Sequence, residues 1–201
     1  LNGKDDIVVL SPTGSGKTLS YLLPLSQLVD ASSDEVQAVV VVPGRELALQ
    51  SANVLKDMGS GLRGMACYGG RPTMDEHRKL REVKPQIVFA TPGRLNDHLD
   101  KLNIIADNIK YLVLDEFDKC LEMGFHDEMQ ALISKLPHDV RSVLLSATPD
   151  EELKDQKIIN SKFTTLNFLP EEEQVPDRVH IYKVESPQKD KLETLRQLLL
   201  T

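Results

Sequence analysis

The chain has 201 residues, of which 40% are hydrophobic, so it can bury one sizeable core and a single compact domain is expected. Its 24 basic and 31 acidic residues give a formal charge of −7, which excludes a generally basic surface, so any nucleic-acid contact requires a local basic face. Cys67 and Cys120 lie far apart without CxxC spacing, which argues against a disulfide framework or a zinc site and favours a reducing, cytoplasmic compartment.

Short, β-branched apolar runs alternate along the chain with helical patterns. The runs cover residues 7–10, 38–42, 86–90, 111–114 and 142–145, and the helical patterns lie near 17–29, 45–58, 72–82, 94–101 and 125–136. A continuous apolar run is typical of a parallel strand that is covered on both faces. The alternation therefore predicts an α/β fold with a doubly wound, mainly parallel sheet and helices on both faces. Ligands of such sheets bind beyond the carboxyl ends of the strands.

A glycine-rich stretch follows the first predicted strand and precedes a helical pattern. It reads Ser11-Pro12-Thr13-Gly14-Ser15-Gly16-Lys17-Thr18, with Ser11 where the strict Walker pattern has Gly. Backbone N–H groups in such a loop bind phosphate, Lys17 can reach the β and γ phosphates, and Thr18 can hold Mg²⁺. The alternative is a plain turn before an ordinary helix. The context favours a site for ATP or GTP formed by Thr13, Gly14, Ser15, Gly16, Lys17 and Thr18.

The predicted strand 111–114 ends in Asp115-Glu116-Phe117-Asp118. Two adjacent carboxylates at the end of a buried strand are costly unless they meet a cation, and nucleotide-bound Mg²⁺ supplies one. We expect Asp115 to hold the metal through its water shell and Glu116 to orient or deprotonate the attacking water. The alternative is an acidic pair that only favours the start of a helix.

Small hydroxyl residues follow the predicted strand 142–145. In Ser146-Ala147-Thr148, the two hydroxyl groups can bond to Asp118 and link the state of the nucleotide to a second surface. A simple turn or helix cap is the alternative interpretation.

In this order, the three elements resemble the DEAD-box family of superfamily 2 RNA helicases over roughly residues 1–150. Residues 11–18 are similar to motif I, which usually begins with Ala, residues 115–118 to motif II and residues 146–148 to motif III. Three further stretches look like motif Ia, the GG element and motif Ib: Pro43-Gly44-Arg45-Glu46-Leu47-Ala48, Gly69-Gly70 and Thr91-Pro92-Gly93-Arg94.

The resemblance implies a RecA-like domain that uses ATP and Mg²⁺ and couples hydrolysis to local unwinding of RNA or remodelling of RNA–protein complexes. It implies catalytic roles for Lys17, Asp115 and Glu116, with Thr18 and Asp115 at the metal and Asp118, Ser146 and Thr148 in coupling. Single-stranded or duplex RNA would be bound through its backbone by Arg45, Gly70, Thr91, Gly93 and Arg94. Thr91 can also cap the helix that follows it, whose N–H groups then face a phosphate.

Domain organisation follows from the same resemblance. Residues 1–165 are expected to form the first RecA-like ATP-binding domain without the upstream Q motif, 166–178 a linker, and 179–201 the start of a second RecA-like domain. A strand-like pattern at 179–184 and a helix-like pattern at 189–200 agree with this. The absent initiator methionine and the amphipathic end suggest that both termini are cuts. No run approaches the roughly 18 apolar residues of a membrane span, so no membrane partner is expected.

Besides Ser11, two residues depart from the family pattern. Phe117 stands where the family has Ala and must find room near the motif III contact, and Gly44 replaces a Thr whose hydroxyl would contact RNA. The second RecA-like domain supplies the arginine fingers in this family, so the chain alone is expected to bind nucleotide weakly and neither hydrolyse ATP appreciably nor unwind duplexes. Two alternatives stay open: a superfamily 2 DNA translocase and a catalytically weak RNA clamp or scaffold.

Overall fold

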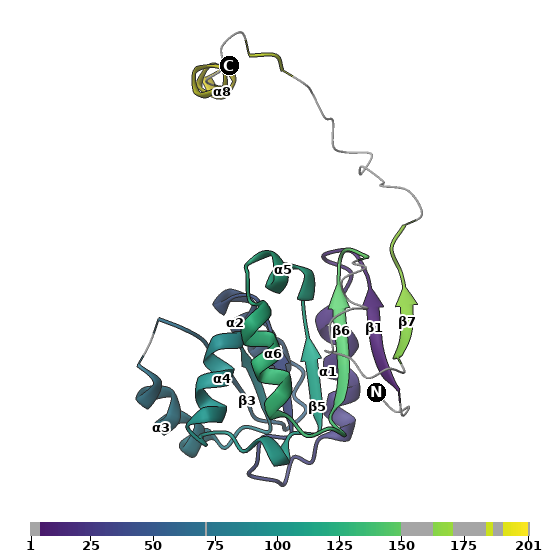
Figure 1. Cartoon of the computed structure of the whole chain (residues 1–201), viewed down its shortest axis with the longest axis vertical. Coiled ribbons are helices and arrows are strands. Elements are labelled where there is room, and N and C mark those ends of the chain that lie inside the picture. The colour runs from purple at the N-terminus through teal and green to yellow at the C-terminus, as the bar shows by residue number, and fades with distance from the viewer. Residues whose placement is uncertain (1–4, 71, 150–162, 171–183, 187–190, 201) are drawn as a thin grey trace. The chain divides into compact units, whose positions relative to one another are not determined.

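The computed structural model describes residues 5–70, 72–149, 163–170, 184–186 and 191–200 (Figure 1). The chain divides into two compact units, Leu1–Leu169 and Pro170–Thr201. In the second unit the structure describes α8 (Leu192–Leu200), which covers most of the helix predicted at 189–200. All but the last residue of the strand predicted at 179–184, and most of the predicted linker, lie outside the described residues.

The first unit is built on a seven-stranded sheet with the order β3-β4-β2-β5-β6-β1-β7, in which all neighbours are parallel. The strands are β1 (Asp6–Leu10), β2 (Ala38–Val41), β3 (Gly64–Cys67), β4 (Ile87–Ala90), β5 (Tyr111–Leu114), β6 (Arg141–Ser146) and β7 (Phe163–Asn167). The predicted doubly wound α/β fold is confirmed. Because β7 ends at Asn167, the sheet continues two residues beyond the boundary that we expected at 165.

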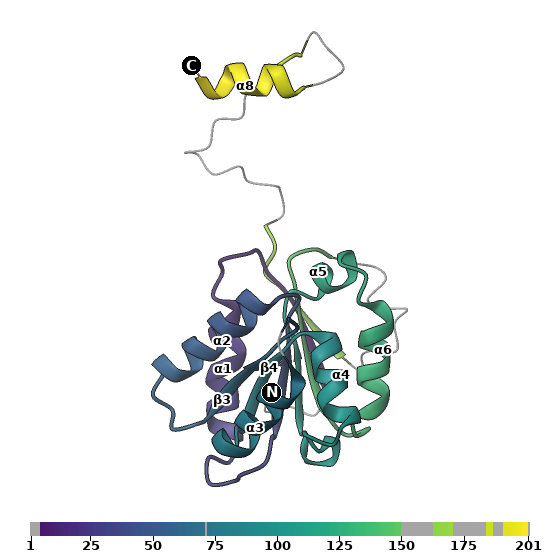
Figure 2. The same ribbon diagram turned by 90° about the vertical axis from the view of Figure 1, so that its left-hand side faces the viewer.

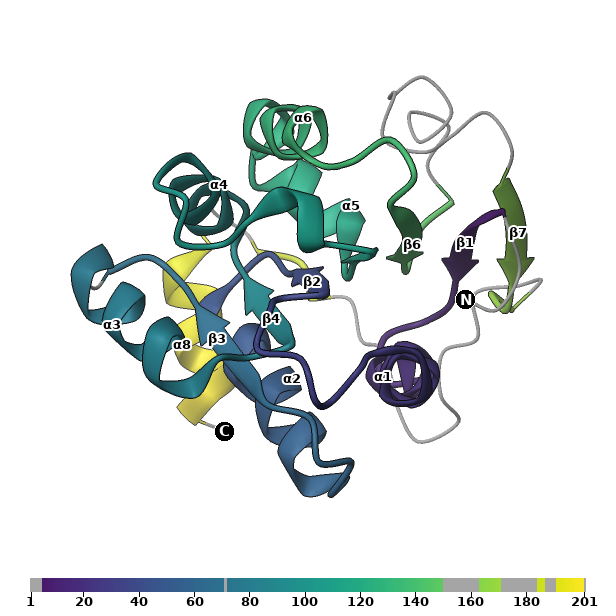
Figure 3. The ribbon, with the colours of Figure 1, turned by 90° about the horizontal axis from the view of Figure 1, so that it is seen from below.

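Helices cover both faces of this sheet (Figures 2 and 3). They are α1 (Lys17–Leu28), α2 (Arg45–Asp57), α3 (Thr73–Val83), α4 (Pro92–Asp100), α5 (Phe117–Glu122) and α6 (His126–Lys135), with a 3₁₀ turn η1 (Ala106–Asn108) before β5. Neighbouring residues of β2 belong to different cores, since Val40 packs with α1 and α2 whereas Val39 and Val41 pack with α4, α5 and α6. This two-sided burial explains the continuous apolar runs. Among the described helices, none combines the length and the apolar character that a bilayer crossing requires.

Phe117 is part of the core that covers the α4–α6 face. Its side chain is 0% exposed and packs in the same cluster as Leu121, Met129 and Leu144. The bulky ring therefore occupies the interior, where an aromatic side chain contributes a large buried apolar surface. The space that we expected this bulky side chain to need is therefore found in the hydrophobic core.

Candidate nucleotide site and neighbouring groove

The functional candidates gather beyond the carboxyl ends of the strands. All these ends lie on the same side of the sheet because the strands are parallel. Ser11 follows β1, Asp115 follows β5, and Ser146 closes β6, which lies between those two strands. The backbone N–H of Ser11 donates to the carbonyl of Ser146 at 2.9 Å. The predicted phosphate loop, acidic tetrad and hydroxyl segment are thus adjacent, although residues 11 and 146 are far apart in the sequence.

The predicted phosphate loop has the backbone of an anion site. Gly14 and Gly16 have φ angles of 79° and 87°, the left-handed region that favours glycine. Gly16 is also the N-cap of α1, and no side chain caps this helix. Thr13, Gly14, Ser15 and Gly16 are exposed, so the N–H groups of the loop and of the first turn of α1 are placed to meet an anion.

Lys17 is held inside this loop. Its side chain is buried, and Nζ donates to the carbonyl oxygen of Ser11 at 3.1 Å. The Oγ atoms of Ser11 and Ser15 lie 2.6 Å apart and close the loop on itself. Ser11, which departs from the Walker glycine, therefore contributes both a carbonyl for Lys17 and a side-chain contact within the loop.

Asp115 is a buried carboxylate with one free oxygen. It is 2% exposed, and Oδ2 accepts a hydrogen bond from Tyr21 Oη at 3.2 Å. Oδ1 has no partner, and it is the only such buried side-chain atom found in the described part of the chain. Burial raises the pKa of Asp115, and the Glu116 charge adds to this, while the Tyr21 bond and the Lys17 charge oppose it.

An unpartnered buried carboxylate oxygen is costly unless it meets a cation or a donor. The Thr18 side chain lies near the same Tyr21 phenol, whose pKa it lowers. Hydroxyl and carboxylate oxygens are the ligands that a hard divalent cation prefers. The residues at this position therefore fit Mg²⁺, with Thr18 and Asp115 as the groups that would hold it.

Glu116 lies at the sharp turn between β5 and α5. Its φ is 51°, an uncommon left-handed conformation for a residue with a side chain, and it is the N-cap of α5. The side chain is 19% exposed, and Oε2 pairs with Lys119 Nζ at 3.2 Å. Unlike Asp115, Glu116 is therefore accessible from solvent.

Asp118 contacts the hydroxyl segment through Thr148, as expected, but not through the Ser146 hydroxyl. Its Oδ2 accepts hydrogen bonds from Thr148 Oγ1 at 3.3 Å and from the backbone N–H of Ala147 at 3.1 Å. The Ser146 hydroxyl instead donates to the carbonyl of Thr148 at 2.8 Å and accepts from its N–H. Ser146 therefore shapes the turn that presents Ala147 and Thr148 to Asp118, a main-chain contact that the sequence did not predict.

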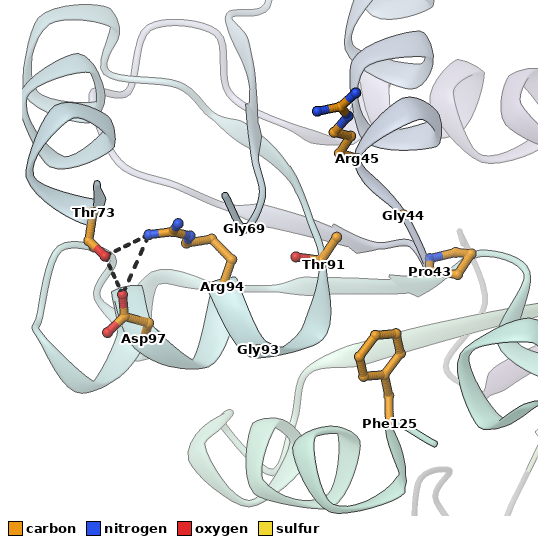
Figure 4. A pocket seen from close by; sticks show the side chains of 10 residues that line it. All are labelled: Pro43, Gly44, Arg45, Gly69, Thr73, Thr91, Gly93, Arg94, Asp97 and Phe125. Atoms are coloured by element: carbon orange, nitrogen blue, oxygen red, sulfur yellow. Dashed lines mark hydrogen bonds and ion pairs between the residues drawn. The ribbon is translucent and has the colours of Figure 1, made fainter. Parts of the chain in front are cut away.

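A groove of about 620 Å³ lies at the same edge, beyond β2, β3 and β4 (Figure 4). It is lined by Pro43, Gly44, Arg45, Gly69, Thr73, Thr91, Gly93, Arg94, Asp97 and Phe125. Four of the five predicted RNA contacts reach this groove or its wall. Gly70, the fifth, follows the lining residue Gly69 and has a φ of 85°.

Two helices begin at the groove without a side-chain cap. Gly44 is the N-cap of α2 and Thr91 is the N-cap of α4, and neither helix has a capping side-chain bond. Thr91 thus takes the N-cap position that we expected, but its hydroxyl makes no capping bond and stands in the groove in Figure 4. Uncapped N–H groups and the positive ends of two helices attract anions, so the groove has the character of a site for successive phosphates.

Arg94 is largely committed to contacts inside the protein. Its side chain is 9% exposed, and Nε lies 3.4 Å from Glu76 Oε2 while Nη1 donates to Thr73 Oγ1 at 2.6 Å. Thr73 in turn donates to Asp97 at 2.7 Å, as Figure 4 shows. Arg94 thereby joins the start of α3 to α4. It lines the wall of the groove, and most of its hydrogen-bonding groups are used within the protein.

Cys67, Glu76 and His98 place three potential metal ligands within 4.8 Å of one another. The Glu76 carboxylate is already used, because it accepts from the N–H of Tyr68 at 3.1 Å and pairs with His98 Nε2 at 2.9 Å as well as with Arg94. Burial, with the Glu76 charge, raises the pKa of the Cys67 thiol and so disfavours the thiolate that metals bind. The cluster is best explained as a structural network whose cation is Arg94.

Sequence reasoning missed several residues that the structure brings into these sites. Tyr21 was one turn beyond Lys17 on a helix that begins in the loop, which is a helical spacing that could have been noticed. Glu76, His98 and Phe125 gave no comparable signal, because their partners lie on other elements.

Comparisons with known proteins agree with this geometry. The sequence model of the DEAD/DEAH box helicase family matches residues 1–156. The chain is 39% identical over 158 residues to the ATP-dependent RNA helicase CshA of Limosilactobacillus reuteri, a match that covers 77% of this chain and 31% of that protein. The chain spans about a third of the length of the curated relatives it matches.

Solved structures give the same result. A DEAD box protein from the hyperthermophile Methanococcus jannaschii superimposes with a TM-score of 0.75 and 32% identity over 81% of this chain and 45% of that one. The DEAD-box helicase Mss116, solved bound to ssRNA and UDP-BeF, superimposes with a TM-score of 0.75 and 31% identity over 84% of this chain and 38% of its own.

Proposed function

The chain belongs to the DEAD/DEAH box helicase family, and from this premise we propose that it is the ATP-binding, RNA-contacting first RecA-like half of an ATP-dependent RNA helicase. The observation that carries the proposal is the single edge at which a phosphate loop, a buried carboxylate with a free oxygen and a groove with two uncapped helix N-termini meet. The relative and the two solved structures described above are themselves named RNA helicases or DEAD box proteins.

Nucleotide binding is assigned to the loop residues Thr13 to Thr18. Their N–H groups would surround the phosphates, and Lys17 would exchange the Ser11 carbonyl for a β or γ phosphate oxygen, since an ammonium pairs more strongly with an anion than with a neutral carbonyl. Thr18 and Asp115 would hold Mg²⁺, which would neutralise charge on the phosphates.

Hydrolysis is assigned to Glu116. Its carboxylate is partly exposed on the turn next to Asp115, so it can reach a water from the solvent side and orient it or accept its proton. Lys119, which pairs with Glu116 here, is a neighbour that this carboxylate must leave or share as the water is bound. Asp115 would thus bind the metal, and Glu116 would act on the attacking water.

RNA is assigned to the groove through its phosphates. Arg45 and the N-terminus of α2 form one phosphate contact, and Thr91 with the backbone of Gly93 forms a second, with Gly69 and Gly70 beside them. Gly44 has no hydroxyl, so the phosphate contact at α2 is weaker than it would be with the Thr that is usual in the family. Arg94 supports the groove from the α3–α4 contact. Contacts of this kind to the RNA backbone do not distinguish one base sequence from another.

Coupling between the sites is assigned to Asp118 and the segment 146–148. The bonds from Thr148 and Ala147 to Asp118 connect the end of β6 to the helix that follows Glu116. A change at the acidic residues on nucleotide binding or phosphate release can therefore be transmitted to the surface formed by residues 146–148.

The remaining assignments concern the longer protein. Since β7 ends at Asn167, we place residues 1–167 in the first RecA-like domain, 168–178 in a linker and 179–201 in the start of a second RecA-like domain, which supplies arginine fingers and the other half of the RNA groove. ATP and RNA close the two domains, one strand is released, and hydrolysis reopens them. The two buried free cysteines fit a reducing, cytoplasmic compartment.

Substituting Lys17 by Ala is expected to weaken nucleotide binding by about 10- to 100-fold, because a hydrogen bond from a charged group contributes roughly 1.5–3 kcal/mol. Titration of the chain with a non-hydrolysable ATP analogue, followed by backbone amide NMR, measures even weak affinities and reports the fold of the variant. Lys79→Ala, an exposed lysine on α3, is the matched control. Equal affinities for the Lys17→Ala and wild-type chains would remove the phosphate role of Lys17.

A further inference from the structure

Tyr21 is a buried polar side chain to which the assignments above give no role. It lies on α1, four residues after Lys17 and therefore on the same face of the helix one turn further on. The side chain is 1% exposed, so its hydroxyl requires a partner within the protein.

The Tyr21 hydroxyl stands at the junction of three elements. It donates to Asp115 Oδ2, at the end of β5, at 3.2 Å, and it lies 3.4 Å from Ser51 Oγ on α2. The Thr18 side chain also lies near this hydroxyl. A single phenol thus meets the proposed metal ligand Asp115, the proposed metal ligand Thr18 and the helix that begins at the groove.

The bond to Tyr21 divides the Asp115 carboxylate into two unlike oxygens. Oδ2 is held by the phenol, whereas Oδ1 is buried without a partner. Rotation of the carboxylate would break the hydrogen bond in a buried environment, where a lost partner is costly. The orientation of Oδ1 is therefore fixed by Tyr21 before any cation arrives.

We propose that Tyr21 is a positioning residue for the divalent cation of the nucleotide, because it holds Asp115 by Oδ2 and leaves Oδ1 as the atom that faces the cation's water shell. The inference rests on the proposed function, since it requires the phosphate loop to bind a nucleotide with Mg²⁺. Outer partners of this kind orient the metal-binding carboxylate and commonly change metal affinity by about 10- to 100-fold when they are removed.

The test substitutes Tyr21 by Phe, which keeps the ring and removes only the donor. Affinity for a non-hydrolysable ATP analogue is measured by backbone amide NMR, once with excess Mg²⁺ and once with EDTA, and the ratio gives the gain due to Mg²⁺. We expect Tyr21→Phe to lower this gain about tenfold and to leave the affinity in EDTA within about twofold of wild type. Tyr111→Phe, at the opposite end of β5, is the matched control and should retain the full gain.

A double-substitution cycle with Asp115→Asn separates positioning from general damage. If Tyr21 acts through Asp115, Tyr21→Phe should change the Mg²⁺ gain little in the Asp115→Asn chain, because the two effects are not independent. An unchanged gain in Tyr21→Phe, an equal loss with and without Mg²⁺, or full additivity in the cycle would each overturn the inference. Failure of the wild-type chain to bind the nucleotide, or to show any Mg²⁺ gain, would instead overturn the proposed nucleotide site itself.

Discussion

Substitution of Glu116 by Gln is expected to lower kcat for ATP hydrolysis by about 10²–10⁴-fold, the usual contribution of a general base, while nucleotide affinity changes little. The amide keeps the shape of the side chain and the left-handed turn, but it cannot accept a proton from water. Steady-state hydrolysis in the presence of RNA is the measurement, made on a protein that carries this chain together with a second RecA-like domain.

The control for this experiment is Glu122→Gln, an exposed glutamate at the end of the same helix. It should hydrolyse ATP at the wild-type rate. Because Lys119 pairs with Glu116, Lys119→Ala is a useful companion that changes the neighbour without removing the carboxylate. A Glu116→Gln protein with normal turnover would refute the role assigned to Glu116 and leave the water to another group.

Substitution of Phe117 by Ala, the residue usual in the family at this position, is expected to destabilise the chain by about 3–5 kcal/mol. The ring is fully buried in the core of the α4–α6 face, so its removal leaves a cavity among side chains such as Leu121 and Leu144. Urea unfolding followed by far-ultraviolet circular dichroism measures the effect, because the chain has no tryptophan for fluorescence. This chain has adapted its core to Phe117.

Phe168→Ala provides the comparison, since Phe168 is 64% exposed and its loss should cost no more than about 0.5 kcal/mol. If Phe117→Ala lost under about 1 kcal/mol, the ring would not be part of the core as the structure has it. The accommodation of Phe117 also weakens the case for a catalytically weak clamp, which rested on a disturbance next to the catalytic carboxylates.

The sheet could be predicted where its strands are central and missed where they are not. The runs around Val40 and Val113 are β-branched and buried on both faces, so composition and burial give the same signal. β3 reads Gly-Met-Ala-Cys and lies at one edge, and β7 at the other edge is exposed along its whole length. Neither edge strand needs the apolar run that identified the others.

The candidate sites also contain a part that the sequence predicts and a part that it does not. The phosphate loop and the acidic tetrad are contiguous in sequence, and their spacing carries the chemistry directly. The bond from Tyr21 to Asp115 joins residues 94 positions apart, and the His98–Glu76 pair joins two helices. Such contacts can be inferred only when the order of the strands in the sheet is known. Arg94 is an example, since the motif that contains it predicts an RNA contact but not its ion pair with Glu76 on another helix.

The central claim is tested most directly by RNA-stimulated ATP hydrolysis, measured at one salt concentration for this chain and for a protein that adds a second RecA-like domain. We predict little turnover by the chain alone and a rate at least about 10³-fold higher, dependent on RNA, in the longer protein, because arginine fingers contribute roughly 10³–10⁵ to phosphoryl transfer. Robust RNA-stimulated turnover by the chain alone, or none in either protein, would contradict the account of a split helicase core.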